Sequence, residues 1–388
     1  MSEYQYYEFL AIDQALDRRQ QQELRALSTR ARITPTSFVN TYDWGDFKGD
    51  PRDLMARYFD AFLYLANWGT RQLMLRLPSS LLDLEAVSRY CPSDSACGWS
   101  AGDQVIVALT SERSDDAWEE EAEDGLSAIV PVRSELAGGD RRLLYLAWLV
   151  SVDAGEVADH GREPPVPPGL AALSVSLQRV VEFLRIDEDL LWAAAQASEP
   201  FRPIEPSAAD LTQWVVDLSD HEKDALLGRL ISGEPHLRAE LTRRFRTERN
   251  SVGEAPGDRT VAELREAARR HAEQRDQLVV QRRADEQARR ERAGAAARQR
   301  HLAALARRQD QAWKQVDAAI ASRQSAQYDE AVELLKDLRA VSAAAQPPEA
   351  FDQRLGDLRQ RHAKKRAFLQ RLERADLGAG PPGGGAQR

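Results

Sequence analysis

The most specific chemical pattern in the 388-residue sequence is a run of arginines between positions 282 and 308. This stretch holds nine arginines against three carboxylates, those of Asp285, Glu286 and Glu291. In a helix that turns about 100° per residue, seven of the nine share roughly a third of the circumference along about 39 Å of axis. These seven are Arg282, Arg283, Arg289, Arg290, Arg300, Arg307 and Arg308. Guanidinium groups bind phosphates and carboxylates through paired hydrogen bonds, so the stripe predicts contact with nucleic acid or with an acidic protein surface.

The same pattern is also compatible with a plain, solvent-exposed helix. Asp285 with Arg289 and Glu286 with Arg290 are spaced to form i,i+4 ion pairs, which stabilise an isolated helix. No aromatic residue interrupts the stripe, so stacking on the bases of a single strand is not indicated. Three alternatives therefore remain open: a phosphate contact, an acidic protein partner and an exposed spacer.

A second candidate is the acidic stretch TYDWGDFKGDP, residues 41–51. Asp50 stands directly before Pro51, a sequence typical of a helix start with an N-cap carboxylate. The two glycines of the stretch permit the turn that leads into this helix. The remaining aspartates match no metal-binding spacing. We therefore predict a capped turn whose aromatic residues, Trp44 and Phe47, form a contact point of the N-terminal region if they are exposed.

Residues 98–102, GWSAG, match the G-x-S-x-G pattern of a nucleophile elbow. That chemistry requires a strand entering the turn and a helix leaving it. Here the loop-like CPSDSAC precedes Ser100 and a predicted strand follows it, so the context is inverted. No catalytic residue is predicted, and a hydrolase built on Ser100 or on the aspartates at 43–50 is only a third alternative.

The sequence contains no pattern that indicates a metal site or a cofactor. Cys91 and Cys97 are too far apart for a C-x2-C zinc pair, and two ordinary thiols are a more natural interpretation than an oxidised loop. The six histidines show no ligand spacing. The acidic run at 112–124 predicts a solvated loop, or else an attraction for a basic partner. We predict no metal site and no cofactor.

The sequence predicts a cytoplasmic protein. No stretch of 18 apolar residues predicts a membrane span, and MSEYQYYEFLAID lacks the features of a signal peptide. Charge is unevenly divided: residues 251–388 carry 27 Lys and Arg against 20 Asp and Glu, whereas residues 1–250 carry 26 against 42. The two halves are expected to have different surfaces and different contacts.

Hydrophobic patterning predicts an α+β protein, and its first part is an α/β, sandwich-like head over residues 1–125. The predicted strands lie at 4–12, 36–44, 71–77 and 103–111. The predicted helices lie at 16–27, 51–67 and 81–90, with Gly69 as the stop of the second. This order fits a compact sheet that helices cover, on one face in the simplest arrangement.

The rest of the chain is predicted to be helical. Residues 126–250 form a layer packed on or next to the head, with 143–150 as a core helix and Ser219 with Glu222 as a capping box. Residues 251–308 form a linker and the long arginine-rich helix, which has no sustained heptad seam. Residues 309–377 form a helical hairpin or bundle that includes one helix over 349–374, and 378–388 are disordered by composition.

Two resemblances add to this interpretation. The stretches TSFVNTYDWGDFKGDP, LYLAWL, PPVPPGL and VVEFLRIDEDLL resemble a family of bacterial proteins for which no activity is established. Residues 328–339 and 354–377 are similar to the helical tails of some bacterial SWIM zinc-finger proteins. The SWIM metal motif requires three cysteines and a histidine, whereas this chain has only two cysteines, so the resemblance does not imply a zinc function.

Together these patterns predict a non-enzymatic, cytoplasmic adaptor. Its helical arm is expected to contact an unknown protein partner or a second copy of the chain, and no membrane. The alternative is a nucleic-acid-associated protein that uses the arginine stripe on phosphates.

Overall fold

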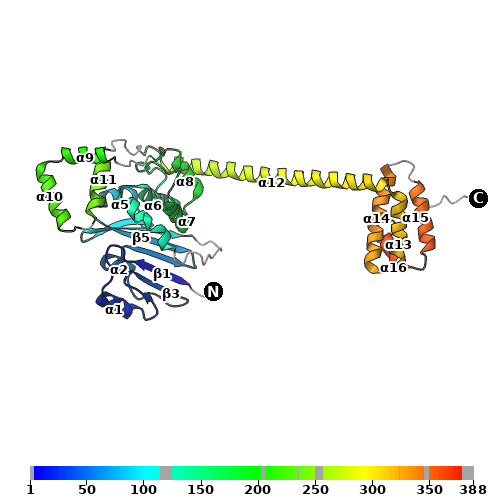
Figure 1. Ribbon diagram of the computed structural model, residues 1–388, viewed down its shortest axis with the longest axis horizontal. Helices are drawn as coiled ribbons and strands as arrows, with labels where there is room; N and C mark the ends of the chain where they lie inside the picture. Colours follow the sequence, from blue (N-terminus) through cyan, green and yellow to red (C-terminus); the bar gives the residue numbers. More distant parts are fainter. Residues whose placement is uncertain are drawn as a thin grey trace, which may run out of the picture. The chain divides into compact units, whose positions relative to one another are not determined.

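The structure is a computed structural model that describes residues 4–113, 125–201, 207–234, 236–249, 257–322, 324–344 and 349–377. It combines one β-sheet with many helices, which confirms the α+β class (Figure 1). The chain divides into two compact units, residues 1–275 and 276–388. The first unit contains the predicted head, the predicted helical layer and the beginning of the long helix. The predicted acidic loop and the predicted disordered tail lie almost wholly outside the described residues.

The described part of the first unit is built on one seven-stranded sheet in which every pairing is antiparallel. The strand order is β2-β3-β1-β4-β5-β7-β6. The strands are β1 (Gln5–Leu10), β2 (Arg32–Ile33), β3 (Ser37–Tyr42), β4 (Ala61–Ala66), β5 (Thr70–Pro78), β6 (Ala96–Ala101) and β7 (Gln104–Glu112). Strands β2 and β6 were not predicted from the sequence.

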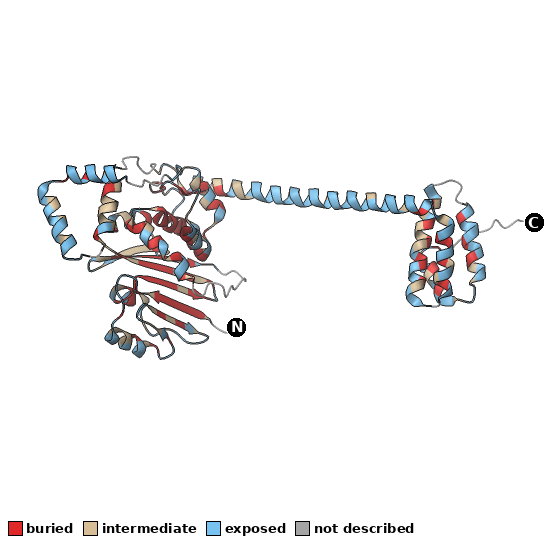
Figure 2. Ribbon diagram, in the orientation of Figure 1, coloured by how far each residue is buried: buried red, intermediate tan, exposed pale blue. Residues whose placement is uncertain are grey.

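One face of the sheet carries the larger hydrophobic core. Leu63, Leu73 and Val107 lie on this face, since side chains alternate along a strand. The helices that contribute to this core are α3 (Leu84–Tyr90), α4 (Leu126–Ile129), α5 (Pro131–Ala137), α6 (Arg142–Asp153), α7 (Val175–Leu184), α8 (Glu188–Ala195) and the beginning of α12 (Val261–Ala306). Helix α6 is buried from Arg142 to Val152, as its apolar sequence predicted (Figure 2).

The opposite face of the sheet holds a smaller, aromatic core. Phe9, Phe38 and Phe62 are fully buried there, and the rings of Phe9 and Phe62 lie 4.3 Å apart. Two short helices, α1 (Arg18–Leu27) and α2 (Pro51–Arg57), contribute Leu24, Leu54 and Met55 to this core. Apolar side chains therefore line both faces of the central strands.

The predicted helix at 51–67 is wrong beyond its first two turns. Helix α2 ends at Arg57, and Ala61–Ala66 form β4 in the middle of the sheet. β4 is hydrogen-bonded to β1 on one edge and to β5 on the other. Gly69 does not stop a helix: its φ of +101° lies in the tight turn between β4 and β5. The unbroken apolar run FLYLA arises because a strand buried on both faces has no polar side.

Three helices complete the first unit before the long helix begins. They are α9 (Ala208–Asp217), α10 (Asp220–Ile231) and α11 (Leu237–Arg249). The predicted capping box is confirmed: Ser219 accepts a hydrogen bond from the backbone of Glu222, whose carboxylate accepts one from the backbone of Ser219. Trp214 and Leu218 pack with Phe245 of α11 in a small core of their own.

The long helix α12 (Val261–Ala306) begins in the first unit and ends in the second. The second unit continues with α13 (Gln309–Ala321), α14 (Ser325–Ala344), α15 (Glu349–Arg361) and α16 (Arg366–Arg374). Their core contains Trp313, Ile320, Leu335 and Leu358. No helix among the described residues is both long enough and apolar enough to cross a membrane.

The predicted single helix at 349–374 is also wrong, because α15 and α16 are separated at 362–365. The break contains no proline or glycine. The Lys365 ammonium donates to the backbone carbonyl of Ile320 in α13, which fixes the break against a neighbouring helix. As a result both Leu358 before the break and Phe368 after it are fully buried in one core.

Candidate interaction surfaces and buried polar clusters

All seven arginines of the predicted stripe are exposed, but the predicted helix to residue 308 is wrong at its end: α12 stops at Ala306, and Arg307 and Arg308 lie in the turn that follows. Arg290 forms the predicted i,i+4 pair with Glu286, at 2.5 Å, whereas Arg289 and Asp285 form no pair. Within the described part of the chain, none of the other six stripe arginines forms an ion pair. We call these seven residues the arginine surface, and most of its positive charge is uncompensated.

Arg298, which lies outside the arginine surface, shows how the end of α12 is oriented within the second unit. Its guanidinium lies 2.5 Å from the Asp337 carboxylate of α14, and His301 lies 2.7 Å from the same carboxylate. Leu302 and Leu305 contribute to the core on this side of the helix. At about 100° per residue, Arg300 points about 160° away from Leu302. Arg300 therefore faces away from the bundle.

The last two members of the arginine surface border a groove in the second unit. The groove has a volume of about 760 Å³, and Arg307, Arg308, Trp313, Phe351 and Arg354 are among the residues that line it. The rings of Trp313 and Phe351 are 5.6 Å apart. Arg354 pairs with Asp310 at 2.8 Å, whereas Arg307 and Arg308 remain unpaired within the described structure. The groove thus combines apolar surface with excess positive charge.

Trp313 and Arg354 come together only through the fold, since they are 41 positions apart in the sequence. The Arg354 guanidinium lies 6.0 Å from the centre of the Trp313 ring. Both residues lie in the helical bundle that the sequence predicted over 309–377, but the sequence singled out neither of them. No local signal links the two residues, because α15 and α13 are separated by the whole of α14.

The two predicted aromatic contact residues differ in exposure. Trp44 is 69% exposed, and the Arg30 guanidinium lies 5.3 Å from the centre of its ring. Phe47 is half-buried and packs against the aromatic core, with its ring 5.1 Å from that of Tyr7. Only Trp44 is therefore freely available for a contact.

Two of the three aspartates around these aromatics have structural roles. Asp50 caps α2 by accepting a hydrogen bond from the backbone of Arg52 at 2.8 Å, as predicted. Asp46 accepts a hydrogen bond from the Gln5 side chain at 3.2 Å. The loop at 43–50 thus corresponds to the capped turn that the sequence predicted.

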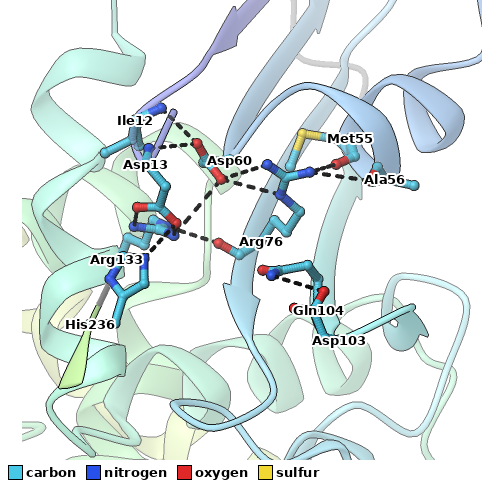
Figure 3. Close-up of polar contacts among 10 residues, drawn as sticks. All are labelled: Ile12, Asp13, Met55, Ala56, Asp60, Arg76, Asp103, Gln104, Arg133 and His236. Atoms are coloured by element: carbon cyan, nitrogen blue, oxygen red, sulfur yellow. Dashed lines mark hydrogen bonds and ion pairs between the residues drawn. The ribbon is translucent and has the colours of Figure 1, made fainter. Parts of the chain in front are cut away.

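A buried acid–base cluster lies where β1, β5 and α5 meet (Figure 3). The Asp60 carboxylate is 1% exposed. One of its oxygens accepts hydrogen bonds from the backbone of Ile12 at 2.6 Å and of Asp13 at 2.9 Å. The other accepts from Arg76 at 2.8 Å. Arg76 also donates to the carbonyls of Met55 and Ala56, at the end of α2.

Arg133 of α5 joins this cluster to a second carboxylate. It forms a two-pronged ion pair with Asp13 and donates to the carbonyl of Arg76 at 2.8 Å (Figure 3). His236 approaches Asp13 at 3.3 Å. Every carboxylate oxygen in the cluster already has a donor, which indicates a structural tie between elements that are far apart in the sequence.

A second polar cluster attaches the beginning of α12 to α8. His271 lies 2.7 Å from the buried carboxylate of Asp189, which also pairs with Arg275 at 3.1 Å. The imidazole stacks on Trp192, with ring centres 3.8 Å apart. A pocket of about 260 Å³ next to it is lined by Asp153 and Arg265, among others, and burial raises the pKa of Asp153. No group of three His, Cys, Asp or Glu side chains suited to a metal exists among the described residues.

Ser100 and the two thiols have no catalytic setting. Ser100 lies within strand β6, close to its turn into β7, and not at a strand-to-helix elbow. Cys91 and Cys97 are both free. Burial raises the pKa of the Cys91 thiol to about 12, which keeps it protonated and unreactive at neutral pH.

Comparison with known proteins adds no relative. No family model matches the sequence, and no curated protein or solved structure matches it at a significant level. The two resemblances drawn from short stretches therefore stay predictions.

Proposed function

We propose that this protein is a non-enzymatic interaction protein that binds an acidic partner through the arginine surface of α12. The observation that carries the proposal is the pairing state of these residues. Six of the seven arginines have no carboxylate within ion-pair distance in the described structure. Five of the seven lie on one side of α12, and Arg307 and Arg308 follow its end. An aligned set of free guanidinium groups matches an extended acidic surface.

The contrast with the arginines of the sheet-containing unit supports this proposal. Arg76, Arg133 and Arg259 are held by Asp60, Asp13 and Glu163, respectively. Those arginines fix the fold, and their charge is compensated. Among the described residues, no arginine of the arginine surface forms an ion pair with another element, so this charge is available to a partner.

The groove at the end of α12 supports a protein partner in particular. A carboxylate that pairs with Arg307 or Arg308 would lie beside the apolar surface of Trp313 and Phe351. At protein interfaces, arginine and aromatic side chains are often the residues that contribute most of the binding energy. The proposed partner therefore presents carboxylates next to an apolar side chain.

The test is affinity capture from the native cell with the full chain and two variants. The first variant changes Arg282, Arg289, Arg300 and Arg307 to Gln. The second is a control of equal charge that changes Arg18, Arg238, Arg292 and Arg374, all exposed, to Gln. A true partner is captured by the wild type and the control and is lost with the first variant.

Two results would contradict the proposal. The first is a set of captured proteins that is identical for all three chains. The second is equal loss with both variants, which would mean that total charge matters and the arrangement on α12 does not. Unchanged thermal unfolding of both variants shows that the fold is intact.

The second candidate function is binding to the phosphates of a nucleic acid. It is favoured by the alignment of Arg282, Arg289 and Arg300 along α12, which extends over about 27 Å at 1.5 Å per residue, with Arg307 just beyond the end of the helix. Binding of duplex DNA and duplex RNA by the full chain is measured across a salt series. If four phosphates are contacted, a plot of the logarithm of the association constant against the logarithm of the salt concentration has a slope of about −3.6. The slope for the first variant is expected to be much closer to zero. Absence of binding at low salt excludes this candidate.

A further inference from the structure

Helix α10 carries an exposed apolar face that nothing in the described structure covers. Leu227, Leu230 and Ile231 are 55%, 64% and 85% exposed. Helix α10 has no fully buried residue, which is unusual for a helix of 12 residues. In Figure 2 this helix is pale blue over most of its length. A helix with this composition normally packs its leucines against another element.

Ion pairs with α11 hold the opposite side of α10 in place. Arg244 of α11 pairs with Glu222 at 3.0 Å, and Arg229 pairs with Glu240 of α11 at 2.7 Å. The small core of Trp214, Leu218 and Phe245 lies on this inner side, with Leu226 packed against it. The exposed leucines thus belong to the outer face of a helix that is already fixed in position.

The apolar face continues into an acidic stripe along the same line of the helix. Asp220, Asp224, Leu227 and Ile231 follow one another at spacings of four, three and four, so they share one side of α10. Asp220 is fully exposed and approaches only Lys223, at 3.4 Å, and Asp224 has no recorded partner in the described structure. We call Asp220, Asp224, Leu227, Leu230 and Ile231 the α10 face.

The surroundings of the α10 face are acidic as well. Residues 207–234 contain six Asp and Glu against Lys223 and Arg229. Both of these cations already have carboxylate neighbours: Lys223 lies 3.4 Å from Asp220, and Arg229 lies 2.6 Å from Glu234. A ligand of the α10 face therefore meets apolar surface bordered by negative charge.

We propose that the α10 face docks an amphipathic helix of a partner protein whose apolar stripe is flanked by Lys or Arg. The apolar stripe of such a helix covers Leu227, Leu230 and Ile231, and its cations approach Asp220 and Asp224. Helices with apolar anchors at i, i+3, i+4 and i+7 bind apolar faces of this kind. Pairing with the α10 face of a second copy is disfavoured, because this face holds no Lys or Arg that could pair with Asp220 and Asp224.

The test uses the full chain and two labelled synthetic helices with the same leucine spacing, one with lysine and one with glutamate at the polar positions. Fluorescence anisotropy at low salt is expected to show at least about tenfold tighter binding of the lysine helix. The variant Leu227→Gln, Leu230→Gln, Ile231→Gln is expected to bind it at least about tenfold more weakly. The variant Asp220→Asn, Asp224→Asn is expected to lose the preference for lysine and most of the salt dependence.

The matched control is Leu278→Gln, Val279→Gln, Val280→Gln, which removes three similarly exposed apolar residues from α12. It is expected to bind the lysine helix like the wild type. Equal affinity for both helices, or unchanged affinity of the α10 variant, would overturn the proposal. A dimer in light scattering that becomes monomeric in the α10 variant would overturn it as well, by identifying a second copy as the occupant. None of the substituted residues belongs to the arginine surface. A negative result here therefore does not contradict the proposed function, and a negative capture experiment does not contradict this proposal.

Discussion

Arg298 and Asp337 form a close ion pair between α12 and α14, with 2.5 Å between the guanidinium and the carboxylate. His301, one turn further along α12, approaches the same carboxylate. Arg300 lies between these two residues in the sequence but is exposed and unpaired within the described structure. Arg298 thus helps to hold the second unit together, whereas Arg300 does not.

Asp337→Asn is expected to destabilise the second unit, because Arg298 and His301 both lose their carboxylate. The side chains of Arg298 and His301 are about half exposed, so the loss is about 1 kcal/mol. Calorimetry of the full chain measures the shift in the unfolding transition. Arg300→Ala is the control and should leave the midpoint unchanged. If Arg300→Ala shifts the midpoint as much as Asp337→Asn, our assignment of the two sides of α12 is wrong.

Asp60→Ala is expected to be the most damaging substitution in the sheet-containing unit. It leaves Arg76 without its carboxylate and leaves the backbone N–H groups of Ile12 and Asp13 without an acceptor. Breaking a buried ion pair in this way costs about 3–5 kcal/mol. Urea unfolding followed by tryptophan fluorescence provides the measurement. Asp43→Ala, at an exposed position of the loop before α2, should change the unfolding free energy by less than about 0.5 kcal/mol.

The two thiols are expected to differ in reactivity. Burial raises the pKa of Cys91 to about 12, so its reactive thiolate stays scarce as the pH rises from 7 to 9. Cys97 is only half-buried and lies 3.3 Å from the Arg52 guanidinium. Iodoacetamide at pH 8 should therefore label Cys97 in the native protein and both thiols in urea, as read by peptide mass spectrometry. Native labelling of Cys91 in a Cys97→Ser variant would contradict the burial argument.

Trp44 and Phe47 are expected to respond differently to truncation, although the sequence presents them as a pair. Phe47→Ala removes contacts with Tyr7, Phe9 and Phe38 and should cost about 2 kcal/mol. Trp44→Ala should leave the unfolding free energy within about 0.5 kcal/mol of the wild type, because its ring is mostly exposed. Urea unfolding of both variants gives the comparison. Equal destabilisation would show that Trp44 packs more closely than its exposure indicates.

The sequence alone determined the features that depend on neighbouring residues. Asp50 before Pro51 predicted the start of α2, and Ser219 with Glu222 predicted the cap of α10, because capping bonds join residues two or three positions apart. The long polar helix and the alignment of its arginines up to Arg300 also follow from local sequence, since helical periodicity places residues on faces without tertiary contacts. The end of the helix at Ala306 was not predicted.

Only the tertiary structure decided the features that depend on distant partners. Ala61–Ala66 became a strand because β1 and β5 hydrogen-bond to both of its edges, and its apolar run could not distinguish a buried strand from a buried helix. The break at 362–365 depends on α13, and the cluster around Asp60 joins residues from positions 12 to 133. Likewise, Arg298 pairs with Asp337, whereas Arg300 forms no ion pair in the described structure. Sequence spacing cannot encode such choices, because hydrogen bonds and ion pairs depend on distances in space that only the folded chain establishes.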